Sequence, residues 1–177
     1  MFLCYNRQVD IMEIRLAENI DINNVIEFYK TLSNDPNNKA RWNYGIYPTD
    51  DDLINDISNK ELYILIDDKE IVSAAVIQMH EDELYKDINW KKHNPAVVHI
   101  LATHSLKQHH GYGKKLLLYL IDIAKSNNKD SIHLDIVYDN DYARKLYESV
   151  GFVKCEDKEL YYPDTGVILS TLFEYII

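Results

Sequence analysis

A chain of 177 residues, 46% of them hydrophobic, can bury a large core as one domain without disulfides or a structural metal. The formal net charge of −10 opposes nucleic acids and anionic membranes as partners and favours cationic ones. No apolar run approaches the roughly 20 residues that span a bilayer, and Arg7 and Asp10 interrupt the start, so the sequence indicates neither a transmembrane helix nor a signal peptide.

The two cysteines, Cys4 and Cys155, stand near opposite ends of the chain and form no C-x-x-C pattern. They suggest neither a disulfide framework nor a zinc site, and they favour a reducing compartment. We therefore expect a cytoplasmic protein with a single domain over residues 1–177, as a monomer or a homodimer.

The first third of the chain predicts one strand and two helices. Glu13–Ala17 is a strand candidate, and Met12 just before it is an alternative start that would leave residues 1–11 as a loose extension. Asp21 can cap a helix to about Leu32. After a loop at 33–38, a second helix begins at Thr49 or Asp50 and runs to about Asn59, with the acids 50–52 at its N-terminus.

The rest of the chain alternates strands with helices. Strands are expected at 62–66, 71–79, 96–103, 131–137, 152–155 and 168–175, and helices at 114–126 and 141–149. The order is βααββ followed by βαβαββ. It predicts an α/β (α+β) domain in which helices flank a mixed sheet.

One segment, Lys107–Lys115, has the composition of an anion-binding loop. It holds two of the five glycines, one residue apart, together with three lysines, two histidines and no acid. It lies between a buried-strand pattern and a helical one. A helix that begins at such glycines offers unpaired amides and a positive dipole end, which suit phosphate.

The loop alone does not select a ligand. The Walker pattern is absent, and G-x-G-x-x-G fails because Leu116 occupies the third glycine position. These departures disfavour an NTPase or a dinucleotide enzyme. The alternative is a tight turn with solvated lysines.

A second segment, Asn140–Phe152, helps to interpret the loop. Together the two segments resemble the GNAT superfamily of N-acetyltransferases. Its pyrophosphate loop, Q/R-x-x-G-x-G/A, is similar to Gln108, Gly111 and Gly113. Its helix pattern, N-x-x-A-x-x-L-Y-E-x-x-G-F, is matched by Asn140, Ala143, Leu146, Tyr147, Glu148, Gly151 and Phe152. The resemblance implies a mixed, mostly antiparallel sheet of about seven strands.

The resemblance also implies acetyl-CoA as co-substrate, with no metal, and direct attack of an amine on the thioester. In the family the strand matching 96–103 bulges and splays from the strand matching 131–137, and pantetheine lies in the gap. The implied cofactor-binding residues are Leu101, Ala102, Thr103, Gln108, His109, His110, Gly111, Tyr112, Gly113, Lys114 and Asn140. His109 and His110 are expected beside phosphate rather than on a metal.

The candidate base is His99, because an imidazole with a pKa near 6.5 suits neutral pH and an alkylamine must lose a proton before it attacks. The strand period of two places it on one face with Val97 and Leu101. Many GNAT members have a glutamate where this chain has Val97; the stretch 99–104 instead resembles arylalkylamine N-acetyltransferases. The proton that leaves the amine is expected to pass through water, Glu81 or Glu83. The alternative is a core histidine bonded to backbone.

Tyr147 matches the family's general acid. An unshifted tyrosine donating to a thiol runs uphill by about 2 kcal/mol, so hydrogen bonding to the developing thiolate is the safer description. The alternative is a core tyrosine, since the chain has fourteen.

On the acceptor side, Trp42, Tyr44 and Tyr47 are candidates for an aromatic wall or a cation–π contact, or for simple packing. Glu81 is a further substrate candidate, and the segment 161–166 can line the same pocket. We expect an acetyl-CoA-dependent N-acetyltransferase for a primary amine of a small molecule or peptide. The alternatives are a catalytically weak acetyl-CoA-binding or regulatory module and a nucleotide-binding protein.

Overall fold

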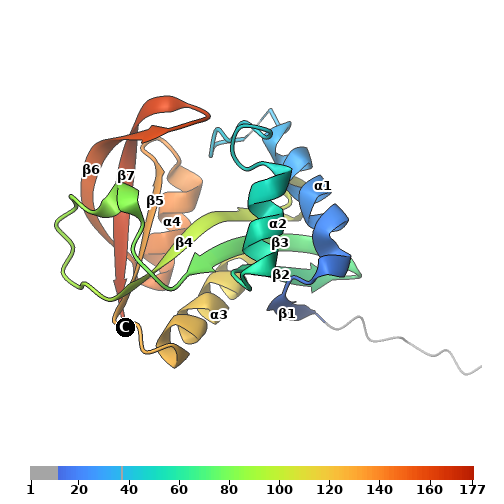
Figure 1. Ribbon diagram of the computed structural model, residues 1–177, viewed down its shortest axis with the longest axis horizontal. Coiled ribbons are helices and arrows are strands. Elements are labelled where there is room, and N and C mark those ends of the chain that lie inside the picture. Colours follow the sequence, from blue (N-terminus) through green and yellow to red (C-terminus); the bar gives the residue numbers. More distant parts are fainter. Residues whose placement is uncertain (1–11, 37) are drawn as a thin grey trace, which may run out of the picture.

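The computed structural model describes residues 12–36 and 38–177. The expected N-terminal extension, residues 1–11, and Cys4 within it lie outside the described residues. In the described part, one seven-stranded sheet carries four α-helices in the predicted order (Figure 1). None of these helices is long and apolar enough to cross a membrane.

The strands are β1 (Glu13–Leu16), β2 (Leu62–Asp67), β3 (Glu70–Gln78), β4 (Pro95–Thr103), β5 (Ser131–Val137), β6 (Val153–Tyr162) and β7 (Gly166–Ile176). The α-helices are α1 (Ile22–Ser33), α2 (Asp50–Ser58), α3 (Tyr112–Ser126) and α4 (Asp141–Val150), and short 3-10 helices occur at Asn19–Asp21, Glu83–Tyr85 and Ser105–Lys107. The sheet order is β1-β2-β3-β4-β5-β7-β6. Among the described strands only β4 and β5 pair in parallel, so the predicted mixed, mostly antiparallel sheet is confirmed.

The helices cover the sheet from both sides (Figure 1). Strand β2 shows why: Leu62 and Ile64 pack in the cluster that contains α1 and α2, whereas Tyr63 and Leu65 pack in the cluster that contains α3 and Tyr147 of α4. Side chains alternate across a strand, so a continuous apolar run fills two cores.

The predicted N-cap of α2 is confirmed, whereas the predicted N-cap of α1 is wrong. Thr49 caps α2 in a reciprocal arrangement: its Oγ1 accepts from Asp52 N at 3.1 Å, and Asp52 Oδ2 accepts from Thr49 N at 2.9 Å. Asp21 precedes α1 but its side chain does not cap that helix. Its carboxylate instead pairs with Arg15 at 2.6 Å and accepts from Glu18 N at 2.8 Å, because the short Asn19–Asp21 turn comes first.

Strands β6 and β7 are longer than the predicted 152–155 and 168–175. They form a hairpin closed by the turn between Tyr162 and Gly166, and β6 is an edge strand. Its centre, Glu156–Glu159, is charged, and charged side chains are usual on an edge that faces water. The apolar pattern therefore predicted most of β7 but only the start of β6.

The sheet opens in its middle. β4 and β5 pair only over Pro95–Val97 and Ser131–His133, and beyond this point β4 continues along β3 alone. Between His99 and Ala102 the β3–β4 register shifts, and Ile100 has a φ of +42°, as in a β-bulge. The predicted splay and bulge are thus present, and the opening they create positions the site.

Candidate active site

Two adjoining pockets occupy the opening between β4 and β5. The larger has a volume of about 800 Å³ and reaches the start of α3; the smaller, of about 430 Å³, lies among β4, β5 and α2. We call them the cofactor pocket and the acceptor pocket. They share the lining residues Ala40, Trp42, Leu101, Asn140, Ala143 and Tyr147.

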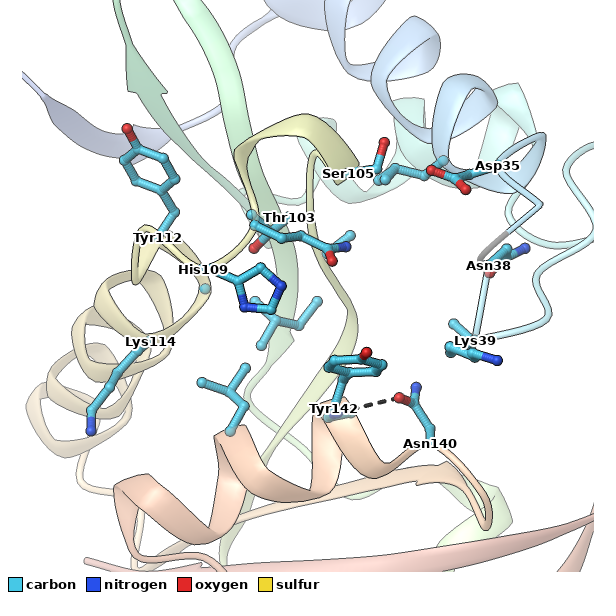
Figure 2. Close-up of a pocket in the computed structure, with 18 of the residues that line it drawn as sticks. Asp35, Asn38, Lys39, Thr103, Ser105, His109, Tyr112, Lys114, Asn140 and Tyr142 are labelled. Atoms are coloured by element: carbon cyan, nitrogen blue, oxygen red, sulfur yellow. Dashed lines mark hydrogen bonds between the residues drawn. The ribbon is translucent and has the colours of Figure 1, made fainter.

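The start of α3 forms the far wall of the cofactor pocket (Figure 2). Gly111 precedes the helix with φ +78° and ψ 10°, a left-handed conformation that favours glycine, and its carbonyl accepts the helical bond from Lys115 N at 3.0 Å. The earlier amides of a helix have no partner within it, and the helix dipole there attracts anions. This cradle fits a pyrophosphate.

Gly113 serves a different purpose. A Cβ atom there would lie 2.9 Å from Thr103 Oγ1, so only glycine lets the first turn of α3 approach the end of β4 this closely. Lys114 Nζ donates to the carbonyl oxygen of Ser149 at 3.2 Å, which ties α3 to α4.

Ten of the eleven predicted cofactor residues line the cofactor pocket. The exception is His110, whose ring stacks on Tyr112 and whose Nδ1 lies 2.9 Å from the Gln108 carbonyl oxygen, outside the lining. No group of three or more His, Cys, Asp or Glu side chains in the described residues could hold a metal ion.

Several lining residues were not predicted. Figure 2 shows Asn38 and Lys39 on the opposite side of the cofactor pocket from Tyr112 and Lys114. They lie in the loop between α1 and α2, which carries no motif, so only the three-dimensional fold brings a second lysine to the pocket. Ser105, in the short 3-10 helix after β4, and Tyr142, at an unspecified position of the Asn140–Phe152 pattern, also line the pocket and were not predicted.

Tyr147 stands where the two pockets meet. It is buried, its ring packs at 5.5 Å from Phe152 and 6.2 Å from Phe173, and burial and the Asp135 charge raise its pKa above the ordinary value. Asn140 orients this helix, because its Oδ1 accepts from Ala143 N at 3.2 Å (Figure 2).

His99 lies on β4 in the acceptor pocket. Its Nε2 is 3.6 Å from Asp82 Oδ2, and among the described residues this buried atom has no hydrogen-bond partner. Burial lowers the pKa of the imidazole, while the charges of Asp82 and Asp135 oppose that shift in part. No backbone group among the described residues therefore bonds this Nε2 atom.

The strand period predicted for this region does not hold. Val97 packs in a separate cluster with Tyr85 and Trp90, whereas Val98, His99, Ile100 and Leu101 all line the acceptor pocket. The bulge at Ile100 breaks the alternation and turns consecutive residues towards the opening.

The predicted glutamates do not line either pocket. Glu81 Oε2 lies 2.9 Å from Nδ1 of the buried His133, and the exposed Glu83 lies 3.7 Å from Lys86. Asp82 between them lines the acceptor pocket instead. Glu81 was expected on the acceptor side; it anchors the loop that presents Asp82.

The acceptor pocket is acidic. Among the described residues its lining contains five aspartates, one histidine and no lysine or arginine; the aspartates are Asp52, Asp56, Asp82, Asp135 and Asp164. Tyr85 and Tyr162 each donate a hydrogen bond of 2.6 Å to Asp135. Burial, with Glu61 and Asp52 nearby, raises the pKa of Asp56 to about 7.

Of the predicted aromatic wall, two members line the acceptor pocket. Trp42 borders both pockets and Tyr47 the acceptor pocket, whereas Tyr44 turns away and donates to Asp50 at 2.6 Å. The segment 161–166 contributes Tyr162 to Thr165, as expected, and Tyr161 is exposed.

The loop between α1 and α2 is tied to the far side of the opening. Arg41 Nη2 lies 2.6 Å from Asp139 Oδ2, between β5 and α4, and Asn43 N donates to Asp164 Oδ2 at 3.2 Å, in the β6–β7 turn. These two contacts hold Trp42 at the junction of the pockets.

Comparison with known proteins agrees with this geometry. The [ribosomal protein bS18]-alanine N-acetyltransferase of Haemophilus ducreyi is 30% identical over 112 residues, which are 63% of this chain and 69% of that protein. N-alpha-acetyltransferase RimI of Mycobacterium tuberculosis is 33% identical over 75 residues, 42% of this chain and 46% of that protein.

Among solved structures, the ribosomal-protein-S18-alanine N-acetyltransferase from Escherichia coli superposes with a TM-score of 0.70. It covers 94% of each chain at 20% identity, which shows the fold alone. The model of the acetyltransferase (GNAT) family matches residues 26–152. The chain therefore belongs to the GNAT family of N-acetyltransferases.

Proposed function

We propose that the protein transfers the acetyl group of acetyl-CoA directly to a primary amine in a ternary complex. The observation that carries this proposal is the meeting of two pockets at Tyr147, one with an anion cradle and one lined by carboxylates. Such an arrangement lets a thioester and an amine reach the same point from opposite sides, without a covalent enzyme intermediate.

The GNAT family uses acetyl-CoA, and the cofactor pocket fits it. The amides at the start of α3 would bind the pyrophosphate, with Lys39 and Lys114 adding positive charge. Beyond Val97 the edge of β4 that faces β5 has no partner strand in the described part of the chain, so backbone groups near Leu101 and Thr103 can bond pantetheine. An amide there would polarise the thioester carbonyl.

The acceptor amine must lose a proton before it attacks. An alkylamine with a pKa near 10.4 is almost fully protonated at neutral pH, and deprotonation costs roughly 4 kcal/mol at 1.36 kcal/mol per unit. His99 is neutral at this pH because burial lowers its pKa, so its Nε2 can accept the proton directly or through one water. Asp82 at 3.6 Å would stabilise the imidazolium that forms.

Tyr147 would assist departure of the thiolate. Its raised pKa keeps the hydroxyl protonated, so it serves as a hydrogen-bond donor at the junction of the pockets. Its ring is fixed between Phe152 and Phe173, which pre-organises the donor.

The amine belongs to a small molecule or to a peptide. The names of the relatives favour the amino terminus of a protein, whereas a pocket of about 430 Å³ suits a small amine. A panel of small amines and peptides, assayed by release of free thiol from acetyl-CoA, tests the proposal. Transfer to any amine supports the enzyme, and acetyl-CoA binding without transfer to any acceptor supports a catalytically weak module.

A further inference from the structure

Resting on the proposed function, we propose that the acceptor pocket selects a small amine with at least two positive charges, a diamine or polyamine. Asp56 would bind the ammonium group that does not react, while His99 and Asp82 face the nitrogen that does.

The charge of the pocket points to a cation. Five aspartates from α2, β5, the loop after β3 and the β6–β7 turn converge on a space that no lysine or arginine of residues 12–36 or 38–177 lines. Four of them act on one side chain: the negative charges of Asp56, Asp52, Asp82 and Asp135 all raise the pKa of Tyr47. Carboxylates that lie close together in a partly buried space repel one another, and a bound cation offsets this repulsion.

Most of these carboxylates already have protein donors. Asp52 accepts from Thr49, and Asp135 from two tyrosines. Asp164 accepts from Asn43 N, and Asp82 accepts from Leu84 N at 2.8 Å. Within the described part of the chain, Asp56 alone of the five has a carboxylate with no hydrogen-bond or ion-pair partner, although it is only partly exposed. It is the group with most to gain from a ligand cation.

A second, independent feature points to the ligand. His99 lines the same pocket, and its Nε2 atom is buried with no hydrogen-bond partner among the described residues. A buried unpaired nitrogen costs free energy, and an amine of the acceptor would satisfy it. The pocket thus offers two separate polar positions.

These positions differ in their relation to the cofactor pocket. His99 is two residues from Leu101, which borders the cofactor pocket as well, whereas no residue of α2 lines the cofactor pocket. Asp56 on α2 thus borders the acceptor pocket alone, and in the proposal it binds the ammonium group that lies away from the thioester. Trp42, Tyr47 and Val98 line the same pocket; their apolar surfaces suit a methylene chain, and the rings of Trp42 and Tyr47 can attract an ammonium group.

The test compares acceptors that differ in one group: 1,4-diaminobutane, 4-amino-1-butanol and butylamine, with an alanine-terminated peptide alongside. We expect kcat/KM for the diamine, corrected for its two equivalent amines, to exceed that for the amino alcohol by about 10- to 100-fold, since a charge-assisted hydrogen bond is lost. A ratio near one, or a peptide that is the better substrate, would overturn the inference and leave the proposed function intact.

Two isosteric variants locate the effect. Asp56→Asn should lower the ratio of diamine to amino alcohol about 10-fold or more. Asp51→Asn, on the same helix but exposed and outside both pockets, removes the same charge and should keep the ratio. A folded Asp56→Asn enzyme with the wild-type ratio would remove Asp56 from the site. Failure of every acceptor, peptide included, would count against the proposed function itself.

Discussion

The Nε2 atom of His99 lies 3.6 Å from Oδ2 of Asp82, and the imidazole is held neutral by its burial. The neutral form is the one that accepts a proton, so kcat/KM should rise with pH through an apparent pKa below the ordinary value of about 6.5. His99→Gln should lower the rate near neutrality and move the rising limb upward, because the amine must then lose its proton to solvent.

A substitution of Asp82 tests the role of His99 in a second way. Its negative charge raises the pKa of His99, so Asp82→Asn should shift the rising limb of kcat/KM to lower pH and reduce the plateau. A folded His99→Gln enzyme that keeps the wild-type limb would exclude His99 as the base, and Asp82 would be the next candidate. Thermal melting of each variant checks the fold.

Removal of the Tyr147 hydroxyl should affect kcat more than cofactor affinity. Tyr147→Phe keeps the ring contacts with Phe152 and Phe173 and deletes only the donor. We expect kcat to fall about 10- to 1,000-fold. Tyr119→Phe, on α3 and outside both pockets, is the matched control and should retain wild-type kcat. An unchanged kcat in Tyr147→Phe, with chemistry shown to limit turnover, would dismiss its role at the sulfur.

A side chain at Gly111 should weaken acetyl-CoA binding. Asparagine tolerates the left-handed conformation, so Gly111→Asn adds bulk at the cradle without a large backbone cost. Calorimetry should show a loss of affinity of at least about 10-fold, the value of one lost charge-assisted bond. Gly166→Asn is the control: its φ of +72° is similar, its Cβ also meets open space, and it lines neither pocket. Equal affinities for the two variants would place the pyrophosphate elsewhere.

Asp56 should make stability depend on pH. Its pKa is raised to about 7 in the folded protein from an ordinary value of 3.8, so the folded state holds the proton more tightly than the unfolded state. The stability that this proton contributes is complete at pH values below the unfolded-state pKa. It is lost as the pH rises through the folded-state pKa. The melting temperature of Asp56→Asn minus that of the wild type should therefore grow from about pH 4 to pH 7 and then level off. A flat difference would contradict the raised pKa of Asp56.

The cradle could be predicted from sequence because its determinants are local. Gln108, Gly111 and Gly113 stand within six residues. Gly111 adopts a left-handed conformation, and Gly113 allows the helix to approach Thr103 closely. The frame of α4 is local in the same way, since Asn140 caps the helix and Gly151 ends it with a φ of +110°.

The acceptor pocket could not be predicted in this way. Its carboxylates come from separate elements, and each looks like an ordinary surface acid in its own segment. Glu81 and Asp82 show the difficulty: in a loop without periodicity nothing in the sequence says that Glu81 binds His133 while Asp82 faces the pocket. The bulge at Ile100 likewise breaks the strand alternation from which the orientation of His99 was inferred.

The measurement that most directly tests the central claim is a two-substrate initial-rate study, with acetyl-CoA and an accepted amine varied together and mass spectrometry of the product. Direct transfer between the two pockets predicts double-reciprocal lines that intersect, and an amine product heavier by one acetyl group. Parallel lines, with an acetylated form of the protein that transfers its acetyl group to the amine, would contradict the account.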